Sequence, residues 1–426
     1  MRGGRVLPVD MDLDGPPTSL TEVRRELNCR VCRGDWKACR LATCPYLTDV
    51  RDLFRDPSPL ASANLFGASP PSAFVGSYGY PKVLAGPLVP PIREDTSLMD
   101  APEQWVDQDL WDILRFRLTL VRGKAARRVV DARSPDPILR TVQEGAMSAE
   151  PIDTELWLTK KPVLEGPFSA RASPTGPSAD IKKVVLAENP KVPRRVDYIV
   201  DDTDLRAVEG VADLYGHGVA QSHITRVFSV GLLGIGQNRR LVPTEWSITA
   251  VDDILGKRLL EKVRTYPWMD VFRVFGHTAL ANTVAILLAP SAWMYEGLEA
   301  WGIESNPLPA HDHEFYGGRK DYPRQLEGAY HAVKLPILEY LERERRQAGA
   351  VAFLEVYRDW IPLGVWRYRE IARAALAKPP ERFATLPEAM AAMGRRVRLR
   401  LANWITQSVV LPYLAKQRRI EDYAPA

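Results

Sequence analysis

Residues 324–358 read RQLEGAYHAVKLPILEYLERERRQAGAVAFLEVYR, and this stretch decides the fold class. Its first part, 324–347, has a helical pattern of apolar residues and predicts one long helix. The run VAFLEVYR at 351–358 follows it and predicts a strand, because β-branched and aromatic residues are concentrated there. Further helices are expected near 365–377 and 386–410. A strand between helices indicates a fold that mixes both, with the helices gathered late in the chain.

Upstream of this stretch the pattern is more strand-like. One helix is expected at 107–122, with Gly123 at the position of a C-cap. Short apolar runs separated by polar turns predict strands, and Pro/Gly-rich stretches at 58–91 and 165–180 predict turns and loops. The runs expected to form strands are AFVG and KVLAGPLV within 72–91, Val184–Ala187, Tyr198–Val200, Thr225–Leu233 and Ala285–Leu288.

The composition is that of a globular protein. It is 46% hydrophobic and 26% charged, and the net charge is only +4 in 426 residues. Such a small net charge is weak support for nucleic-acid binding, so any such function must rest on local patches. No signal peptide or membrane-spanning run is visible, which makes a cytoplasmic, nucleoid-associated location the expectation.

All four cysteines of the chain fall within residues 29–44, as Cys29, Cys32, Cys39 and Cys44. Four thiolates on two short knuckles are the ligand set of one structural zinc ion, so we expect one Zn²⁺ there. An iron–sulfur cluster uses the same ligands and is the main alternative. Unpaired thiols or disulfides are disfavoured, because the cysteines are clustered and the cytosol is reducing.

Basic residues surround these cysteines and are candidates for contact with DNA phosphates. A basic face of this kind is just as commonly a solvated surface, and both interpretations stay open. The candidate residues are Arg30, Arg33, Lys37 and Arg40.

Several longer blocks carry a family resemblance. They are CRVCRGDWKACRLATCP at 29–45, SAFVGSYGYPKVLAGPLVPP at 72–91, LTLVRG at 118–123, GAMSAEPIDTEL at 145–156, HGVAQSHITRVFSVGLLGIGQNRRLVPTEWSITAVDD at 217–253 and YGGRKDYPRQLEGAYHAVKLPILEYL at 316–341. In this order they resemble the archaeal Nre family over nearly the whole chain. The resemblance implies a role in DNA damage repair, a zinc finger and binding to the sliding clamp (PCNA). It implies no settled chemical activity.

A clamp-binding peptide follows the pattern Q-x-x-h-x-x-a-a, in which an aliphatic residue and aromatics fill one apolar pocket. Gln417, Ile420 and Tyr423 match this pattern, although Ala424 replaces the second aromatic. A second register at 407–414 fits loosely, but it contains Pro412 and its apolar residues are expected to pack the last helix. The Nre resemblance places the motif at the chain end, which favours 417–424.

These observations predict an α+β fold, with a mixed α/β body, an N-terminal four-cysteine zinc module and a mostly helical C-terminal part. The expected segments are a mobile stretch at 1–28, the zinc module at 29–44, an Nre-type N-terminal domain at 45–300, an Nre-type C-terminal helical domain at 305–412 and the tail motif at 417–424.

Polar residues are dense in the block 217–253, which is otherwise apolar. They are His217, His223, Arg226, Glu245, Asp252 and Asp253. Buried histidines and carboxylates suit a nucleotide or phosphodiester site, but they also suit a satisfied hydrogen-bond network. His217, Arg226, Glu245 and Asp252 are the catalytic candidates, and their convergence in one pocket would favour an enzyme.

Two other signals are set aside. GLLGIG at 231–236 lacks the order of a phosphate-binding loop and is interpreted as a tight turn after a strand. His311, His313 and Glu314 do not form a metalloprotease helix motif and are interpreted as surface loop residues. The leading hypothesis is therefore a DNA repair protein recruited by the sliding clamp. The alternative is a nucleic-acid-processing or nucleotide-modifying repair enzyme with its site in 217–253, and the sequence leaves catalysis undecided.

Overall fold

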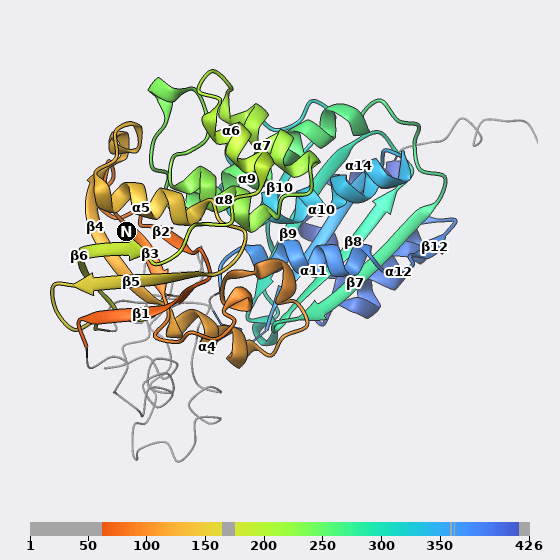
Figure 1. Cartoon of the computed structure of the whole chain (residues 1–426). Coiled ribbons are helices and arrows are strands. Elements are labelled where there is room, and N and C mark those ends of the chain that lie inside the picture. Colours follow the sequence, from red (N-terminus) through yellow and green to blue (C-terminus); the bar gives the residue numbers. More distant parts are fainter. Residues whose placement is uncertain (1–61, 164–174, 358–359, 362, 417–426) are drawn as a thin grey trace, which may run out of the picture.

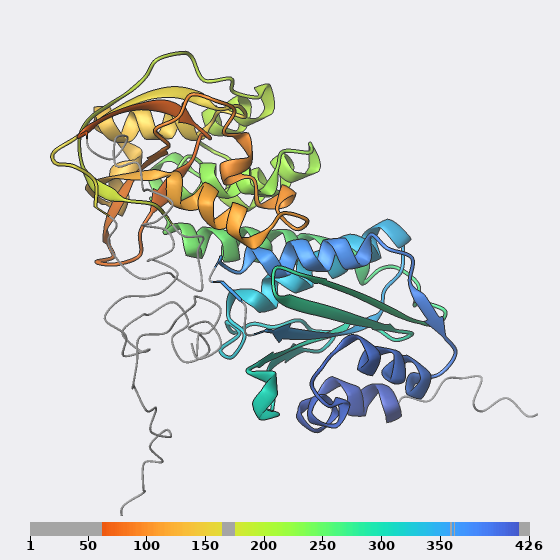
Figure 2. The same ribbon diagram turned by 90° about the horizontal axis from the view of Figure 1, so that it is seen from below.

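Two six-stranded sheets organise the protein. The computed structural model describes residues 62–163, 175–357, 360–361 and 363–416. Each sheet is the centre of one lobe, and helices fill the space between the lobes (Figures 1 and 2). The fold is thus a mixture of α and β structure, as predicted. None of the helices in the described part has the length and hydrophobicity that a membrane crossing requires.

The first sheet has the order β1-β5-β6-β4-β3-β2. Its strands are β1 (Asn64–Ser69), β2 (Ala73–Val75), β3 (Lys82–Val89), β4 (Val121–Arg128), β5 (Ile152–Leu158) and β6 (Ser178–Leu186). Buried and half-buried residues alternate along β5, so one face packs against the core. The sheet curls, so that β1 approaches the segment after β3. There the Ala68 N–H of β1 donates to the Ile92 carbonyl at 2.8 Å. Gly67 is required at this crossing, since a Cβ there would lie 1.8 Å from the Pro90 oxygen.

Two helices flank this sheet, α4 (Leu110–Thr119) and α5 (Pro137–Ala146). The helix predicted at 107–122 is confirmed as α4. Asp109 is its N-cap, because its side chain accepts a hydrogen bond from the Trp111 N–H at 2.7 Å.

A layer of helices follows the first sheet. It consists of α6 (Arg194–Asp201), α7 (Ala207–Gly216), α8 (Gln221–Ser229) and α9 (Thr244–Val263). The strands predicted at 198–200 and 225–233 are therefore wrong, because these residues lie mainly in α6 and α8. A short apolar run cannot by itself distinguish a strand from one buried helical face. The buried residues Ile224 and Val227 are three positions apart and pack with α9 in one core cluster.

The GLLGIG segment turns the chain after α8, as predicted, although a helix precedes it instead of a strand. Gly231 has a φ of +76°. A Cβ there would lie 2.6 Å from the Ala132 Cβ, so the position requires glycine.

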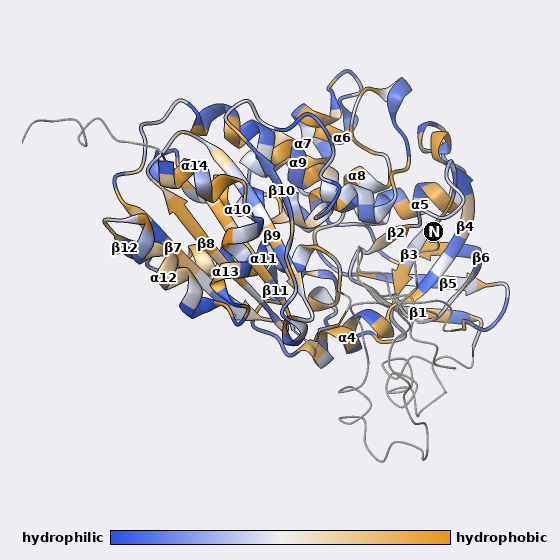
Figure 3. Cartoon of the chain, turned by 180° about the vertical axis from the view of Figure 1, so that it is seen from behind, coloured by the Kyte–Doolittle hydropathy of each residue, from blue (hydrophilic) through white to orange (hydrophobic). Residues whose placement is uncertain are grey.

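The second sheet has the order β10-β9-β11-β8-β7-β12. Its strands are β7 (Phe272–Ala279), β8 (Asn282–Ala289), β9 (Met294–Trp301), β10 (Ala310–Glu314), β11 (Gly349–Val356) and β12 (Glu381–Phe383). All of β8 is buried. Val284 and Ile286 face one core cluster, whereas Ala285 and Leu287 face another. The sheet is therefore covered by helices on both faces, and β7 and β8 are strongly hydrophobic in Figure 3.

The helices of the C-terminal part cover these two faces. They are α10 (Gly328–Glu344), α11 (Trp366–Leu376), α12 (Leu386–Arg396), α13 (Leu401–Gln407) and α14 (Val410–Lys416). α10 and α11 pack on one face, and α12 to α14 pack on the other. The helices predicted at 324–347 and 365–377 and the strand at 351–358 are confirmed. The helix expected at 386–410 is instead broken into separate segments.

The second sheet draws strands from both sides of the expected domain boundary at 300–305. β7 to β9 precede this boundary and β10 to β12 follow it, and β11 lies between β9 and β8. The C-terminal part is rich in helix, but it also supplies a central strand of this sheet.

α9 connects the lobes. At its start the Thr244 Oγ1 accepts a hydrogen bond from the Val75 N–H of β2 at 2.9 Å. Farther along, α9 packs against α10 of the second lobe. This long helix fixes the two lobes side by side, as Figure 2 shows.

Candidate functional site

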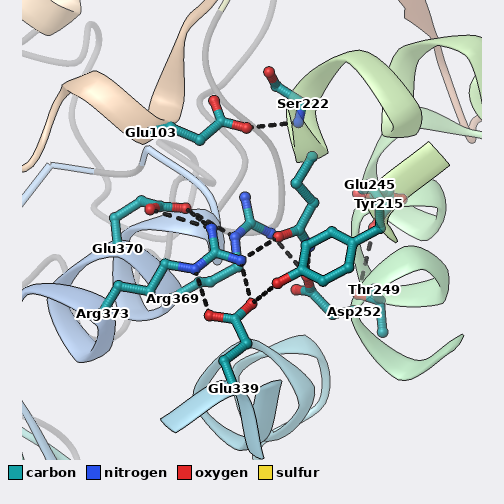
Figure 4. Close-up of polar contacts among 11 residues, drawn as sticks. Glu103, Tyr215, Ser222, Glu245, Thr249, Asp252, Glu339, Arg369, Glu370 and Arg373 are labelled. Carbon is teal, nitrogen blue, oxygen red and sulfur yellow. Dashed lines mark hydrogen bonds and ion pairs between the residues drawn. The ribbon is translucent and has the colours of Figure 1, made fainter. Parts of the chain in front are cut away.

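A network of buried charges joins α9, α10 and α11 (Figure 4). Asp252 lies in the middle of α9 and is 1% exposed. The Arg369 Nη1 of α11 donates to its Oδ1 at 2.8 Å, and the Arg369 Nε donates to Glu370 at 2.9 Å. Burial raises the pKa of Asp252 and that of Glu370, despite the attraction of Arg369. Asp252 Oδ2 has no hydrogen-bond partner among the described residues.

Arg373 extends the network toward α10 and α8. Its Nη2 donates to Glu339 and to Gln221, both at 2.6 Å. The Tyr215 hydroxyl also donates to Glu339, at 2.7 Å. Burial opposes ionisation of Glu339, but these partners outweigh it and lower its pKa. Because the arginines are paired with carboxylates, the network ties together five helices, α7 to α11.

A small pocket of about 70 Å³ adjoins this network. Arg117, Arg226 and Arg369 contribute to its wall. Arg117 is paired with Asp100, whereas Arg226 has no carboxylate partner within ion-pair distance among the described residues. The volume suits a few waters or one small anion, since one water needs about 10–15 Å³ of such a cavity. Pockets for drug-sized ligands are roughly 300–1,000 Å³.

The four catalytic candidates do not meet in this pocket. Arg226 lines it, and Asp252 lies behind Arg369. His217 is exposed at the end of α7, where its Nδ1 lies 2.8 Å from the Asp213 carbonyl. Glu245 lies in the first turn of α9 and accepts from the Thr249 hydroxyl only through its backbone carbonyl.

His223 and Arg226 tie α8 to the segment after α5. The His223 Nε2 lies 3.0 Å from the Met147 carbonyl, and the Arg226 guanidinium donates to the carbonyls of Ala146 and Ser148. Burial and the neighbouring Arg226 lower the pKa of His223 to about 3. Both side chains therefore have a structural role in this packing.

Asp253 pairs with His331 and Lys257. Burial opposes its ionisation, but these two partners lower its pKa to about 2. This aspartate is thus a stable anion that holds α9 to α10.

A second feature lies on the surface of the first lobe, where exposed aromatic and basic side chains gather. We call it the aromatic–basic surface, and it consists of Tyr78, Tyr80, Lys82, Arg128, Arg133, Arg240 and Trp246. Tyr78 is 93% exposed, and Tyr80 and Trp246 are nearly half exposed. The rings of Tyr80 and Trp246 are in contact, with centroids 5.1 Å apart.

Backbone hydrogen bonds hold the segments that carry this surface together. Lys82 lies opposite Arg128 in the β3–β4 register. The Val129 N–H, next to Arg128, donates to the Pro81 carbonyl, and its own carbonyl accepts from the Leu241 N–H at 2.8 Å.

The basic side chains of this surface are available for a ligand. Lys82, Arg128, Arg133 and Arg240 form no ion pair with another described residue. The acids near them are already engaged, since Asp136 pairs with Arg127 and Asp131 accepts from the Arg128 backbone.

Among the residues that the structure describes, Glu296, His311 and His313 form a group that could hold a metal ion. The interpretation of His311, His313 and Glu314 as surface loop residues is wrong, because they lie in β10. Strand alternation separates them: the histidines face one side, and Glu314 is buried on the other. There Glu314 forms an ion pair of 2.7 Å with Lys334.

Comparison with known proteins shows which family the chain belongs to. The family model "Archaeal Nre, N-terminal" matches residues 38–306, and "Archaeal Nre, C-terminal" matches residues 314–423. The chain belongs to the archaeal Nre family. The first match ends after β9 and the second begins at the last residue of β10, so the two matched parts contribute β7 to β9 and β11 to β12 to the same sheet.

Nre relatives match over most of the chain. The DNA repair protein NreB of Archaeoglobus fulgidus is 37% identical over 93% of this chain and all of that protein. NreA of the same organism is 34% identical over 87% of this chain and 94% of its own length. NreA of Haloferax volcanii, also named a DNA repair protein, is 37% identical over 73% of this chain and 78% of its own length. No solved structure matches the chain.

Several predicted Nre-type residues lie outside the described part of the chain. They are Cys29, Cys32, Cys39 and Cys44 of the zinc module, the basic residues Arg30, Arg33, Lys37 and Arg40, and the tail residues Gln417, Ile420, Tyr423 and Ala424. Their roles stay predictions.

Sequence reasoning missed most of the charged network of this Nre chain. Arg369, Glu370 and Arg373 lie within one turn of α11, surrounded by apolar residues. That local pattern was a usable signal for buried charge. Their partners Glu339 and Asp252 are 34 and 117 residues away from the arginines that they bind, which no local pattern indicates.

Proposed function

We propose that this Nre chain acts in DNA repair by binding single-stranded DNA on the aromatic–basic surface, and that the sliding clamp recruits it. The names of the relatives support the repair role. The observation that carries the DNA contact is the grouping of Tyr78, Tyr80 and Trp246 with unpaired cations on one surface.

Single-stranded DNA fits this chemistry. Unpaired bases stack on exposed aromatic rings, and each such contact contributes about 1–3 kcal/mol. Cations beside the rings bind the phosphates and make the affinity depend on salt. In duplex DNA the bases are already stacked on one another, so exposed rings would find no partner there.

Two segments match the clamp-binding pattern, and the burial of side chains in α14 favours 417–424 over 407–414. Val410 and Leu414 are buried against the second sheet. The competing register 407–414 would need these side chains for the clamp pocket, and releasing them would expose part of the core. Binding through Gln417, Ile420 and Tyr423 does not require Val410 or Leu414 to leave the core.

The four-cysteine module is proposed to hold one structural Zn²⁺, on the strength of its spacing. Its basic residues Arg30, Arg33, Lys37 and Arg40 would then add phosphate contacts to those of the aromatic–basic surface. A catalytic role for 217–253 is less favoured, because its candidates are scattered and the nearby pocket is small.

A binding experiment tests the DNA contact. We expect Tyr78→Ala together with Trp246→Ala to weaken binding of a single-stranded oligonucleotide about 5- to 150-fold per ring that stacks, measured by fluorescence anisotropy. Lys82→Ala with Arg128→Ala should weaken binding of all sequences and lower the slope of log affinity against log salt.

Tyr316→Ala is the matched control, because Tyr316 is also exposed but lies in the second lobe. It should leave the affinity unchanged. If the aromatic variants bind like the wild-type chain while their thermal unfolding is also unchanged, this surface is not the DNA site.

A further inference from the structure

We propose that Glu296, His311 and His313 form a binding site for a divalent transition-metal ion on the second sheet. Their potential ligand atoms all lie within 4.8 Å of one another. Nothing in the repair function proposed above requires this site, so the two proposals stand separately.

The strand register explains why the three side chains meet. His313 of β10 lies directly opposite Glu296 of β9. Residues opposite each other in an antiparallel pair share a face, and so do residues two apart in one strand. His311 therefore joins the same face, where its Nδ1 lies 3.0 Å from the Glu296 Oε1. The two imidazole rings are parallel within 7°.

The ligand types suit a transition metal. Two imidazoles and one carboxylate, with a position left open, form the ligand set of catalytic zinc sites and of non-haem iron(II) sites. Such an ion lies about 2.0–2.2 Å from each ligand, so the side chains must close slightly around it. The His311 side chain is only 16% exposed, which leaves it reachable from solvent while its position is restricted.

The buried carboxylate is already held in place. Glu296 is fully buried, and it accepts hydrogen bonds from the Ser408 hydroxyl and from the N–H groups of Val409 and Val410. Metal-binding carboxylates are usually fixed by such outer hydrogen bonds. The same contacts connect the site to the start of α14, the last described helix before the proposed clamp-binding tail.

The test counts metal ions on the full chain. After chelator treatment, the wild-type protein is titrated with Zn²⁺, and bound metal is measured by elemental analysis. We expect the His311→Ala/His313→Ala variant to bind one equivalent fewer than the wild type. His313→Ala alone should lose the same equivalent, and it is the milder variant because no hydrogen bond of its side chain to another described residue is seen. His217→Ala removes an exposed histidine elsewhere and should lose none.

Co²⁺ distinguishes this site from the cysteine module, because thiolate ligands give a strong charge-transfer band that nitrogen and oxygen ligands lack. The histidine variants should keep that band while they lose one equivalent of metal. Equal metal content in the wild type and in the folded His313→Ala variant would overturn the proposal. Loss of both equivalents when only Cys29 and Cys32 are replaced would also overturn it, because the histidine site should keep its ion in that variant.

Discussion

At the scale of single residues, His223 illustrates how burial changes a side chain's chemistry. It is 5% exposed, and its pKa falls to about 3 because burial and Arg226 disfavour the charged form. In the unfolded chain the pKa is near 6.5. Between these values the unfolded state binds a proton that the folded state does not, so the free energy of unfolding decreases as the pH falls below 6.5.

We therefore predict that His223 destabilises the fold by about 1.4 kcal/mol for each pH unit below 6.5, or about 2 kcal/mol at pH 5. The His223→Gln variant should lose this contribution and show a flatter dependence of stability on pH. Urea unfolding of both proteins at several pH values between 5 and 7 measures the difference.

Thr225→Ser is the control, because it changes an uncharged side chain of the same helix. Its stability should follow the wild-type pH dependence. Identical slopes for His223→Gln and wild type would mean that His223 is protonated in the folded protein.

At the scale of elements, buried glutamates fix the connections between the second sheet and the helices that cover it. Glu355 of β11 is fully buried. It accepts hydrogen bonds from the N–H groups of Arg398 and Leu399 at 2.7–2.9 Å and from the Tyr357 hydroxyl at 2.8 Å. These two N–H groups precede α13, so the carboxylate replaces the partners that a strand or helix would provide.

We predict that Glu355→Leu lowers the free energy of unfolding by about 2–5 kcal/mol, because each buried N–H left without a partner costs about 1–3 kcal/mol. Glu355→Gln keeps an oxygen acceptor and should cost less. Chemical denaturation measures both changes. The exposed Glu381, which pairs with Arg395 and Arg396, provides the control: Glu381→Gln should change stability by about 1 kcal/mol or less. A similar effect for both positions would exclude the capping role.

At the scale of the whole molecule, the tail motif is predicted to act separately from the folded body. The described buried residues of α14 end at Leu414, before the motif begins. We predict that deleting 417–426 abolishes binding to the sliding clamp and leaves the melting temperature unchanged. The Ile420→Ala/Tyr423→Ala variant should do the same, because these residues are the proposed anchors.

The isolated 417–426 peptide should bind the clamp with a dissociation constant on the order of micromolar, about 8 kcal/mol, since Ala424 replaces one aromatic anchor. Calorimetric titration measures it. Undiminished clamp binding by the truncated chain would show that the motif has been misassigned.

The sequence by itself determined the features that local chemistry controls. Helices α4, α10 and α11 and strands β8 and β11 were predictable, because periodicity and capping act within one element. The family resemblance was also readable, since it rests on blocks of consecutive residues. Parts of α6 and α8 were mistaken for strands. Tyr198–Val200 and Thr225–Leu233 are too short to show whether their apolar residues follow the helical or the strand periodicity.

Only the tertiary structure decided which polar residues meet. Asp252 was recognisable as a polar residue in an apolar block, but its partner Arg369 lies 117 positions away. His313 and Glu296 become neighbours only through the β9–β10 register. Tyr80 and Trp246, 166 positions apart by their numbering, come into contact only because α9 starts beside β2. Packing brings together residues that no local pattern links, and the candidate sites of this protein are built from such pairs.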